Sequence, residues 1–85
     1  MHDFGLLPQR AVTARILELC NERGITVNAL ATLAAVPPST LKNILCGNSR
    51  NPGIVTIKML CDGLEISLEE FFSADVFKNL LQELE

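Results

Sequence analysis

The sequence predicts an all-α protein, a compact domain of five helices with an extra helix at its C-terminal end. The chain has 85 residues, which is the size of one domain. It is 48% hydrophobic but only 5% aromatic, so aliphatic side chains must fill the core. Apolar residues recur at helical spacing along the chain, and no segment alternates polar and apolar residues as a strand does.

The first predicted helix covers residues 10–23. Its core side is predicted to hold the apolar residues Val12, Ile16, Leu17 and Cys20. Its solvent side is predicted to hold Arg15, Glu18 and Glu22. Gly24 follows at the position where a left-handed residue ends a helix, and Thr26 is placed to cap the next one.

Two short helices are predicted to follow, separated by a sharp break at Pro37-Pro38. The second helix lies within residues 27–36 and has a stripe of Val27, Leu30, Ala31 and Ala34. The third covers residues 38–46, because proline is tolerated in a first turn. Its apolar stripe is Leu41, Ile44 and Leu45, and its other side shows Pro38, Ser39, Lys42, Asn43 and part of Cys46. Gly47 is predicted to close this helix ahead of a loop over residues 48–53.

The C-terminal part is predicted to hold three more helices. The fourth begins at Val55 or Thr56 and runs to about Leu64. Ser67 and Glu70 form a capping-box pattern that opens a short fifth helix ending near Phe72, and Asp75 is placed to cap a last one. That tail has a wide apolar stripe, Val76, Phe77, Leu80, Leu81 and Leu84. Such a stripe must be covered, either by a second copy or by the protein's own first helix.

Charge is unevenly distributed along the chain. The net charge is −3, but residues 1–60 carry six Lys or Arg against three Asp or Glu, and residues 61–85 carry one against seven. No carboxylate lies between Glu22 and Asp62, a stretch that holds Lys42, Arg50 and Lys58. This pattern predicts a phosphate-facing surface in an otherwise acidic protein, the other interpretation being chance clustering.

Several functional classes are disfavoured. Cys20, Cys46 and Cys61 are far apart and form no zinc-binding or disulfide pattern, and the only histidine is His2. We therefore expect no enzyme, no metal and no cofactor. No apolar run approaches the length of a membrane span, and the start does not resemble a signal peptide. The sequence thus predicts a cytoplasmic protein with no membrane partner.

The two short helices around Pro37-Pro38 have the arrangement of a helix-turn-helix. The segment from Ile25 to Phe72 resembles the Cro/phage-repressor (Xre-like) helix-turn-helix domain. The matching elements are Leu30-Ala31, Ala34-Ala35-Val36, Ser39-Thr40-Leu41, Ile44, Gly47, Pro52, Leu60, Gly63-Leu64-Glu65-Ile66 and Leu68-Glu69-Glu70-Phe71. The resemblance implies a lambda-repressor-like fold with a flexible segment over residues 1–9, a DNA-binding domain over 10–72 and a C-terminal helix over 73–85.

The resemblance also implies roles for particular residues. The recognition helix would be 38–46, with base contacts from Pro38, Ser39, Lys42 and Asn43. Phosphate contacts would come from Thr26, Val27, Asn28, Arg50 and Asn51. Leu45, Cys46, Asn48 and Pro38 depart from residue types that are common in the family. Lys42 and Asn43 can also be interpreted as an ordinary solvated helix face.

The function implied by the resemblance is a sequence-specific transcriptional regulator, a repressor, of prokaryotic or phage type. Its partners would be a palindromic double-stranded DNA operator and a second copy of the chain, joined through the apolar tail. The alternative function is a helix-turn-helix fold used as a protein–protein interaction module or as one member of a regulatory pair.

Overall fold

The computed structural model of the chain describes residues 8–46 and 53–79. The regular secondary structure of these residues is all helical: α1 (Pro8–Arg23), α2 (Val27–Ala34), α3 (Pro38–Leu45), α4 (Ile54–Leu64), α5 (Leu68–Phe72) and the 3₁₀ helix η1 (Asp75–Asn79). The all-α prediction is confirmed. In the described part of the chain, no helix is long and apolar enough to cross a membrane.

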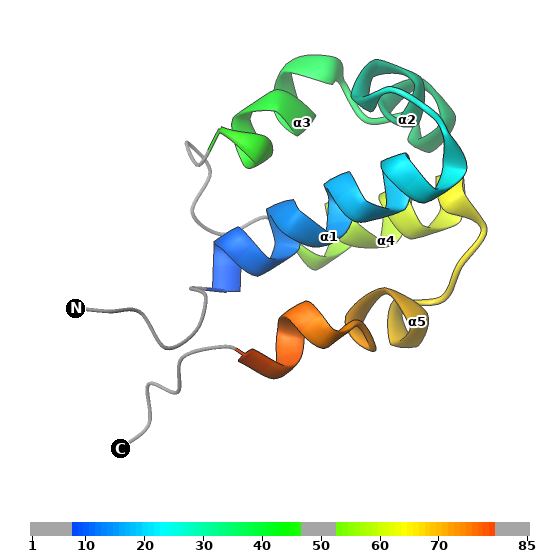
Figure 1. The fold of residues 1–85 in the computed structure, drawn as a ribbon. Coiled ribbons are helices and arrows are strands. Elements are labelled where there is room, and N and C mark those ends of the chain that lie inside the picture. Colours follow the sequence, from blue (N-terminus) through cyan, green and yellow to red (C-terminus); the bar gives the residue numbers. More distant parts are fainter. Residues whose placement is uncertain (1–7, 47–52, 80–85) are drawn as a thin grey trace.

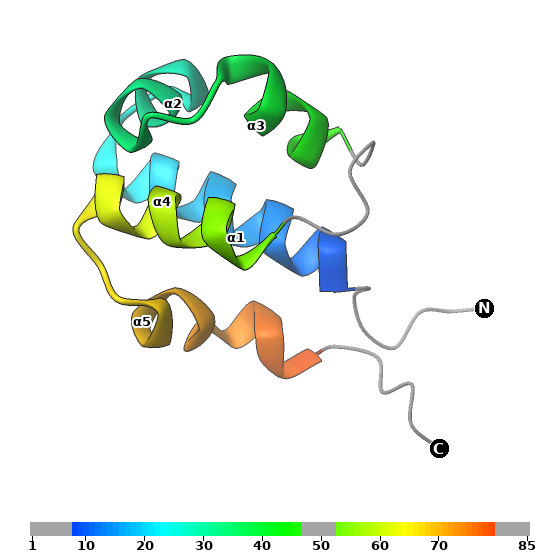
Figure 2. The same cartoon turned by 180° about the vertical axis from the view of Figure 1, so that it is seen from behind.

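The helices are arranged around α1 and α4. The pair α2 and α3 lies on one side of them, and α5 and η1 lie on the other (Figures 1 and 2). The most extensive packing is between α2 and α4, while η1 lies against α1. The largest fully buried side chains come from all five α-helices: Ile16, Leu30, Leu41, Leu60, Cys61, Leu64 and Phe71. A single hydrophobic core therefore fixes the positions of α2 and α3.

The first helix differs in part from the predicted pattern. Val12, Ile16 and Cys20 are buried as predicted, but Leu17 is 46% exposed and Leu19 is buried in its place. Arg15, predicted to face solvent, is only 8% exposed. Its Nε and Nη2 donate hydrogen bonds to the carbonyl oxygens of Phe71 and Glu70, so contacts with a distant helix decide which face of α1 is buried.

Three helices end in the same left-handed turn. After α1, Gly24 has φ +65°, and the amide of Ile25 donates to the carbonyl of Cys20. The same closure follows α2 at Ala35 (φ 59°) and α4 at Glu65 (φ 61°). These are Schellman motifs, in which glycine carries no steric penalty but other residues do. The glycine stop that the sequence predicts after α1 is confirmed, and the other two ends use strained residues.

Ala35→Gly is therefore expected to raise the free energy of unfolding by about 0.5–1 kcal/mol, because it relieves a left-handed conformation at an exposed alanine. The same substitution at Ala29, inside the right-handed α2, is expected to lower it by about 1 kcal/mol. Urea unfolding of the two variants checks the pair. Equal destabilisation by both would contradict the assignment of strain to Ala35.

The C-terminal elements bear out part of the predicted pattern. Ser67 Oγ accepts a hydrogen bond from the amide of Glu70, at 3.0 Å, so the predicted cap of α5 is confirmed. Asp75 does not precede the last helix as a cap but is its first residue, 3.5 Å from Lys78 Nζ. Residues 75–79 form a 3₁₀ helix, and Phe77 packs on the core beside Phe71 and Phe72, with ring centroids 5.9 and 4.9 Å away.

Candidate nucleic-acid interface

The outer side of α3 carries the residues predicted to contact bases. Pro38, Ser39, Lys42 and Asn43 are all exposed and lie at the spacing of one helix face. Leu41 and Ile44 are buried on the opposite face. The predicted boundaries are close to the observed ones, because Pro38 can stand only in a first turn and the carbonyl of Pro37 accepts the amides of Thr40 and Leu41.

Contacts at both ends hold α3 in place. The turn Ala35–Pro37 connects it to α2, and Val36 in this turn is buried. At the other end, Thr13 Oγ1 of α1 donates a hydrogen bond of 3.2 Å to the carbonyl of Ile44. The helix is therefore tied to both α1 and α2, and its polar face is presented by a rigid support.

The start of α2 carries three of the residues predicted to contact phosphates. Thr26 is the N-cap, and its Oγ1 accepts a hydrogen bond of 3.0 Å from the amide of Ala29. Thr26 and Asn28 are exposed, whereas Val27 is half-buried against the core. The amides at the beginning of a helix lack intrahelical acceptors, and they favour anions. This end of α2 is thus chemically suited to a phosphate.

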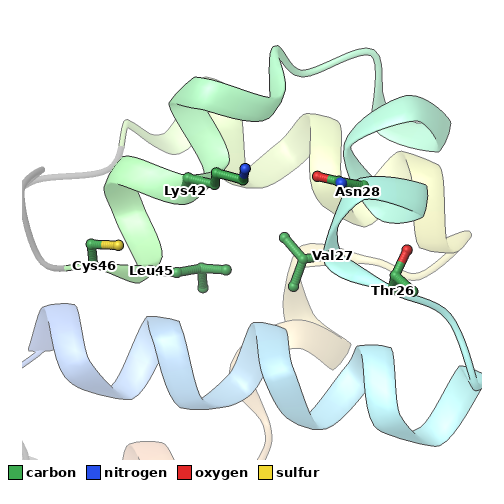
Figure 3. A pocket seen from close by; sticks show the side chains of 6 residues that line it. All are labelled: Thr26, Val27, Asn28, Lys42, Leu45 and Cys46. Atoms are coloured by element: carbon green, nitrogen blue, oxygen red, sulfur yellow. The ribbon is translucent and has the colours of Figure 1, made fainter.

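A surface depression of about 410 Å³ joins these two regions. It is lined by Thr26, Val27 and Asn28 from α2 and by Lys42, Leu45 and Cys46 from α3. Figure 3 shows Lys42 and Asn28 extending toward each other across it, and Val27 and Leu45 doing the same nearer α1. The structure therefore brings predicted phosphate contacts and a predicted base contact to one site.

The depression was not predicted from the sequence, which assigned Leu45 to the core stripe and left Cys46 at a helix end. Leu45 is half-buried and Cys46 is exposed. The spacing of Lys42, Leu45 and Cys46 is that of a shared helix face, and this was the available signal. The spacing within α3 cannot predict the other side of the depression, because that side is formed by α2.

This face carries less unpaired positive charge than the sequence suggested. Lys42 is exposed and makes no ion pair among the described residues. Lys58, by contrast, pairs with Asp62 one turn further along α4. Arg50 and Asn51, the other predicted phosphate contacts, lie outside the described residues.

The described residues provide little for catalysis. Burial raises the pKa of the Cys20 and Cys61 thiols, which disfavours the reactive thiolate. Within residues 8–46 and 53–79, no group of three His, Cys, Asp or Glu side chains could hold a metal ion. The exposed polar side chains on α3 and at the start of α2, such as Thr26, Asn28, Lys42 and Asn43, are instead suited to binding.

Comparisons with known proteins agree with this geometry. The family model of the Cro/C1-type helix-turn-helix DNA-binding domain matches residues 15–75. The crystal structure of the prophage Lp1 protein 11 is similar to this chain, with a TM-score of 0.76 and 32% sequence identity over 86% of this chain and 96% of that one. No curated protein gives a significant match to the sequence. With the family model covering most of the chain and both helices of the motif, the chain belongs to the Cro/C1-type helix-turn-helix DNA-binding domain family.

Proposed function

We propose that this protein is a sequence-specific transcriptional regulator that represses by occupying a DNA operator, with α3 inserted in the major groove. The observation that carries the proposal is the exposed polar face of α3, standing beside the phosphate-suited start of α2. It acts where the DNA of a prokaryotic cell or phage is found, in the cytoplasm. Repression by occupying the operator requires no small-molecule ligand.

The dimensions of α3 suit this role. An α-helix with side chains is about 10–12 Å across, and the major groove is about 12 Å wide. Asn43 has the two polar atoms for a bidentate contact with adenine, and Lys42 can donate to guanine or to a phosphate. Ser39 can reach either kind of base, and Pro38 can touch a thymine methyl group.

Phosphate contacts position the domain in this proposal. Thr26, Val27 and Asn28 meet the backbone through side-chain oxygens and the free amides at the start of α2. Arg50 and Asn51 contribute from the segment between α3 and α4. With so few cations available, one copy binds weakly, and binding falls steeply as salt rises.

A homodimer on a palindromic operator follows from the need for a second set of contacts. Two copies related by a two-fold axis would place their α3 helices about 34 Å apart, one turn of DNA. The proposed interface is the apolar tail: Val76, Phe77, Leu80, Leu81 and Leu84. Val76 and Phe77 are half-buried where η1 packs on α1, and the three leucines lie outside the described residues. Phe72, 39% exposed beside Phe77, extends this apolar surface.

The proposal is tested by selecting binding sites from a random DNA pool at low and moderate salt, while the mass of the protein in solution is measured. A palindromic motif recovered by a dimer is the expected result. Recovery of no sequence above background would exclude the operator-binding regulator and favour the protein–protein interaction module. A motif without symmetry, bound by a monomer, would remove the dimer but keep the regulator.

Asn43→Ala is expected to relax the preference at one base pair of the selected site by about 1–3 kcal/mol, because one bidentate contact is lost. Arg50→Ala is the control, expected to weaken binding to all sequences alike and to lower the salt slope by about one. Fluorescence anisotropy on single-substitution operators measures both. Identical behaviour of the two variants would refute the division between base and phosphate contacts.

A further inference from the structure

The depression between α2 and α3 has a polar rim and an apolar floor. Lys42 and Asn28 face each other across the rim, from α3 and α2 (Figure 3). The floor is formed by Val27 and Leu45, both half-buried and packed against the core. A site that binds only a phosphate would not need aliphatic side chains beneath the ammonium group of Lys42. The apolar floor therefore suits a ligand that is anionic on one side and apolar on the other.

The proposed binding mode brings such an occupant to this place. When α3 enters the major groove, the helix before it crosses the backbone of the strand that borders the groove. The depression lies between these two helices, so that strand runs over it. A backbone unit of DNA has an anionic phosphate and, next to it, a deoxyribose whose C2′ is a plain methylene group.

We propose, on the basis of the function proposed above, that the depression seats one deoxyribose–phosphate unit of the operator and selects deoxyribose against ribose at that nucleotide. The phosphate lies against Lys42, Asn28 and the first amides of α2. The C2′ face of the sugar lies on Val27 and Leu45. Val27 is therefore a specificity-determining residue for the sugar, in a position where the sequence alone suggested an apolar stripe and a phosphate contact.

The physical basis is the cost of an unpaired hydroxyl. A ribose carries a 2′-OH, and the floor formed by Val27 and Leu45 offers only carbon to it. A hydroxyl moved from water into such a place without a partner is expected to weaken binding about 5- to 30-fold. The 2′-OH is also the group by which proteins tell RNA from DNA at a given site.

The experiment replaces one deoxynucleotide at a time by its ribonucleotide, along both strands of the selected operator, and measures affinity by anisotropy. We expect one position in each half-site to weaken binding about 5- to 30-fold. A 2′-fluoro sugar at the same position is the control for sugar pucker, since it favours the ribose pucker but lacks the hydroxyl donor. It is expected to weaken binding much less than ribose does.

Two variants assign the effect to the floor. Val27→Thr supplies a hydroxyl partner at nearly constant volume and is expected to bring the ratio of deoxyribose to ribose affinity close to one. Leu33→Thr likewise introduces a hydroxyl, at a 58% exposed position of α2 outside the depression, and is expected to leave the ratio unchanged.

The outcomes separate this proposal from the one on which it rests. Specific DNA binding without a ribose-sensitive position, or with one that Val27→Thr does not change, overturns the sugar site and leaves the regulator standing. An equal penalty from 2′-fluoro and ribose assigns the effect to pucker and likewise overturns it. Absence of specific DNA binding overturns both proposals.

Discussion

Gly63→Val is expected to lower the free energy of unfolding by about 3 kcal/mol, because α2 and α4 approach each other too closely at this point for any side chain. A Cβ at Gly63 would lie 2.9 Å from both the backbone nitrogen and the Cα of Ala34, and 3.0 Å from its Cβ. These are atoms of a helix backbone, so they cannot move aside as a flexible side chain would. One of the two helices must shift.

Gly63→Ala separates this packing effect from helix propensity. In an open helix interior, alanine would stabilise by about 1 kcal/mol relative to glycine. Here we expect a net loss of about 1–2 kcal/mol, because overpacking exceeds the gain in propensity. Adding Ala34→Gly removes only the Cβ and leaves the two backbone atoms, so the double variant should stay destabilised.

The matched control is Gly53→Ala, because a Cβ there meets no atom within 4 Å. Gly53 is the N-cap of α4, and its substitution is expected to lower the free energy of unfolding by no more than about 0.7 kcal/mol. Urea unfolding and thermal melting measure all four variants. A rise in the melting temperature of Gly63→Ala would contradict the close approach. Because the start of α2 carries the proposed phosphate site, a shift of α2 caused by Gly63→Ala should also weaken DNA binding.

Arg15→Met is expected to lower the free energy of unfolding by about 3 kcal/mol, because it removes a buried cation that ties α1 to α5. The guanidinium donates from Nε to the carbonyl of Phe71 at 2.8 Å and from Nη2 to that of Glu70 at 2.9 Å. It also lies 6.0 Å from the centre of the Phe71 ring. Methionine keeps the apolar stem but leaves both carbonyls without this donor.

Two further variants test which of the Arg15 contacts matter. Arg15→Lys retains the charge but cannot make the planar, two-pronged contact. Its loss of unfolding free energy should therefore be about half of that expected for Arg15→Met. Glu18→Gln removes the charge of the partner 2.8 Å from Nη1, but Glu18 is half exposed, and the cost should stay below about 1 kcal/mol. Hydrogen exchange is expected to show α5 opening first in Arg15→Met. Equal losses from Arg15→Met and Glu18→Gln would assign the stability to the ion pair instead.

Much of the fold followed from local sequence rules. The break at Pro37-Pro38, the left-handed Gly24 and the caps at Thr26 and Ser67 each act within about four residues, and each was predicted correctly. The polar face of α3 was predicted from the same kind of periodicity, since Leu41 and Ile44 fix the buried side. Where spacing within one helix decides the outcome, the sequence was sufficient.

The failures share a different cause. Arg15 is buried because the carbonyls of Glu70 and Phe71 receive it, and no pattern within α1 contains that information. Ala35 and Glu65 adopt left-handed turns without glycine, because the elements that they connect are held by the core. Gly63 lies near the end of α4, but nothing in the local sequence indicates that it packs against Ala34, because that contact depends on how two helices pack.

For the candidate site, the sequence by itself determined which residues face outward from α3 and which begin α2, because helix period and capping are local properties. Only the tertiary structure decided that Lys42, Leu45 and Cys46 share a depression with Thr26, Val27 and Asn28. The distance between two helices is set by the side chains packed between them and their neighbours, such as Gly63 against Ala34. That distance depends on contacts far apart in the chain, and no local pattern specifies it.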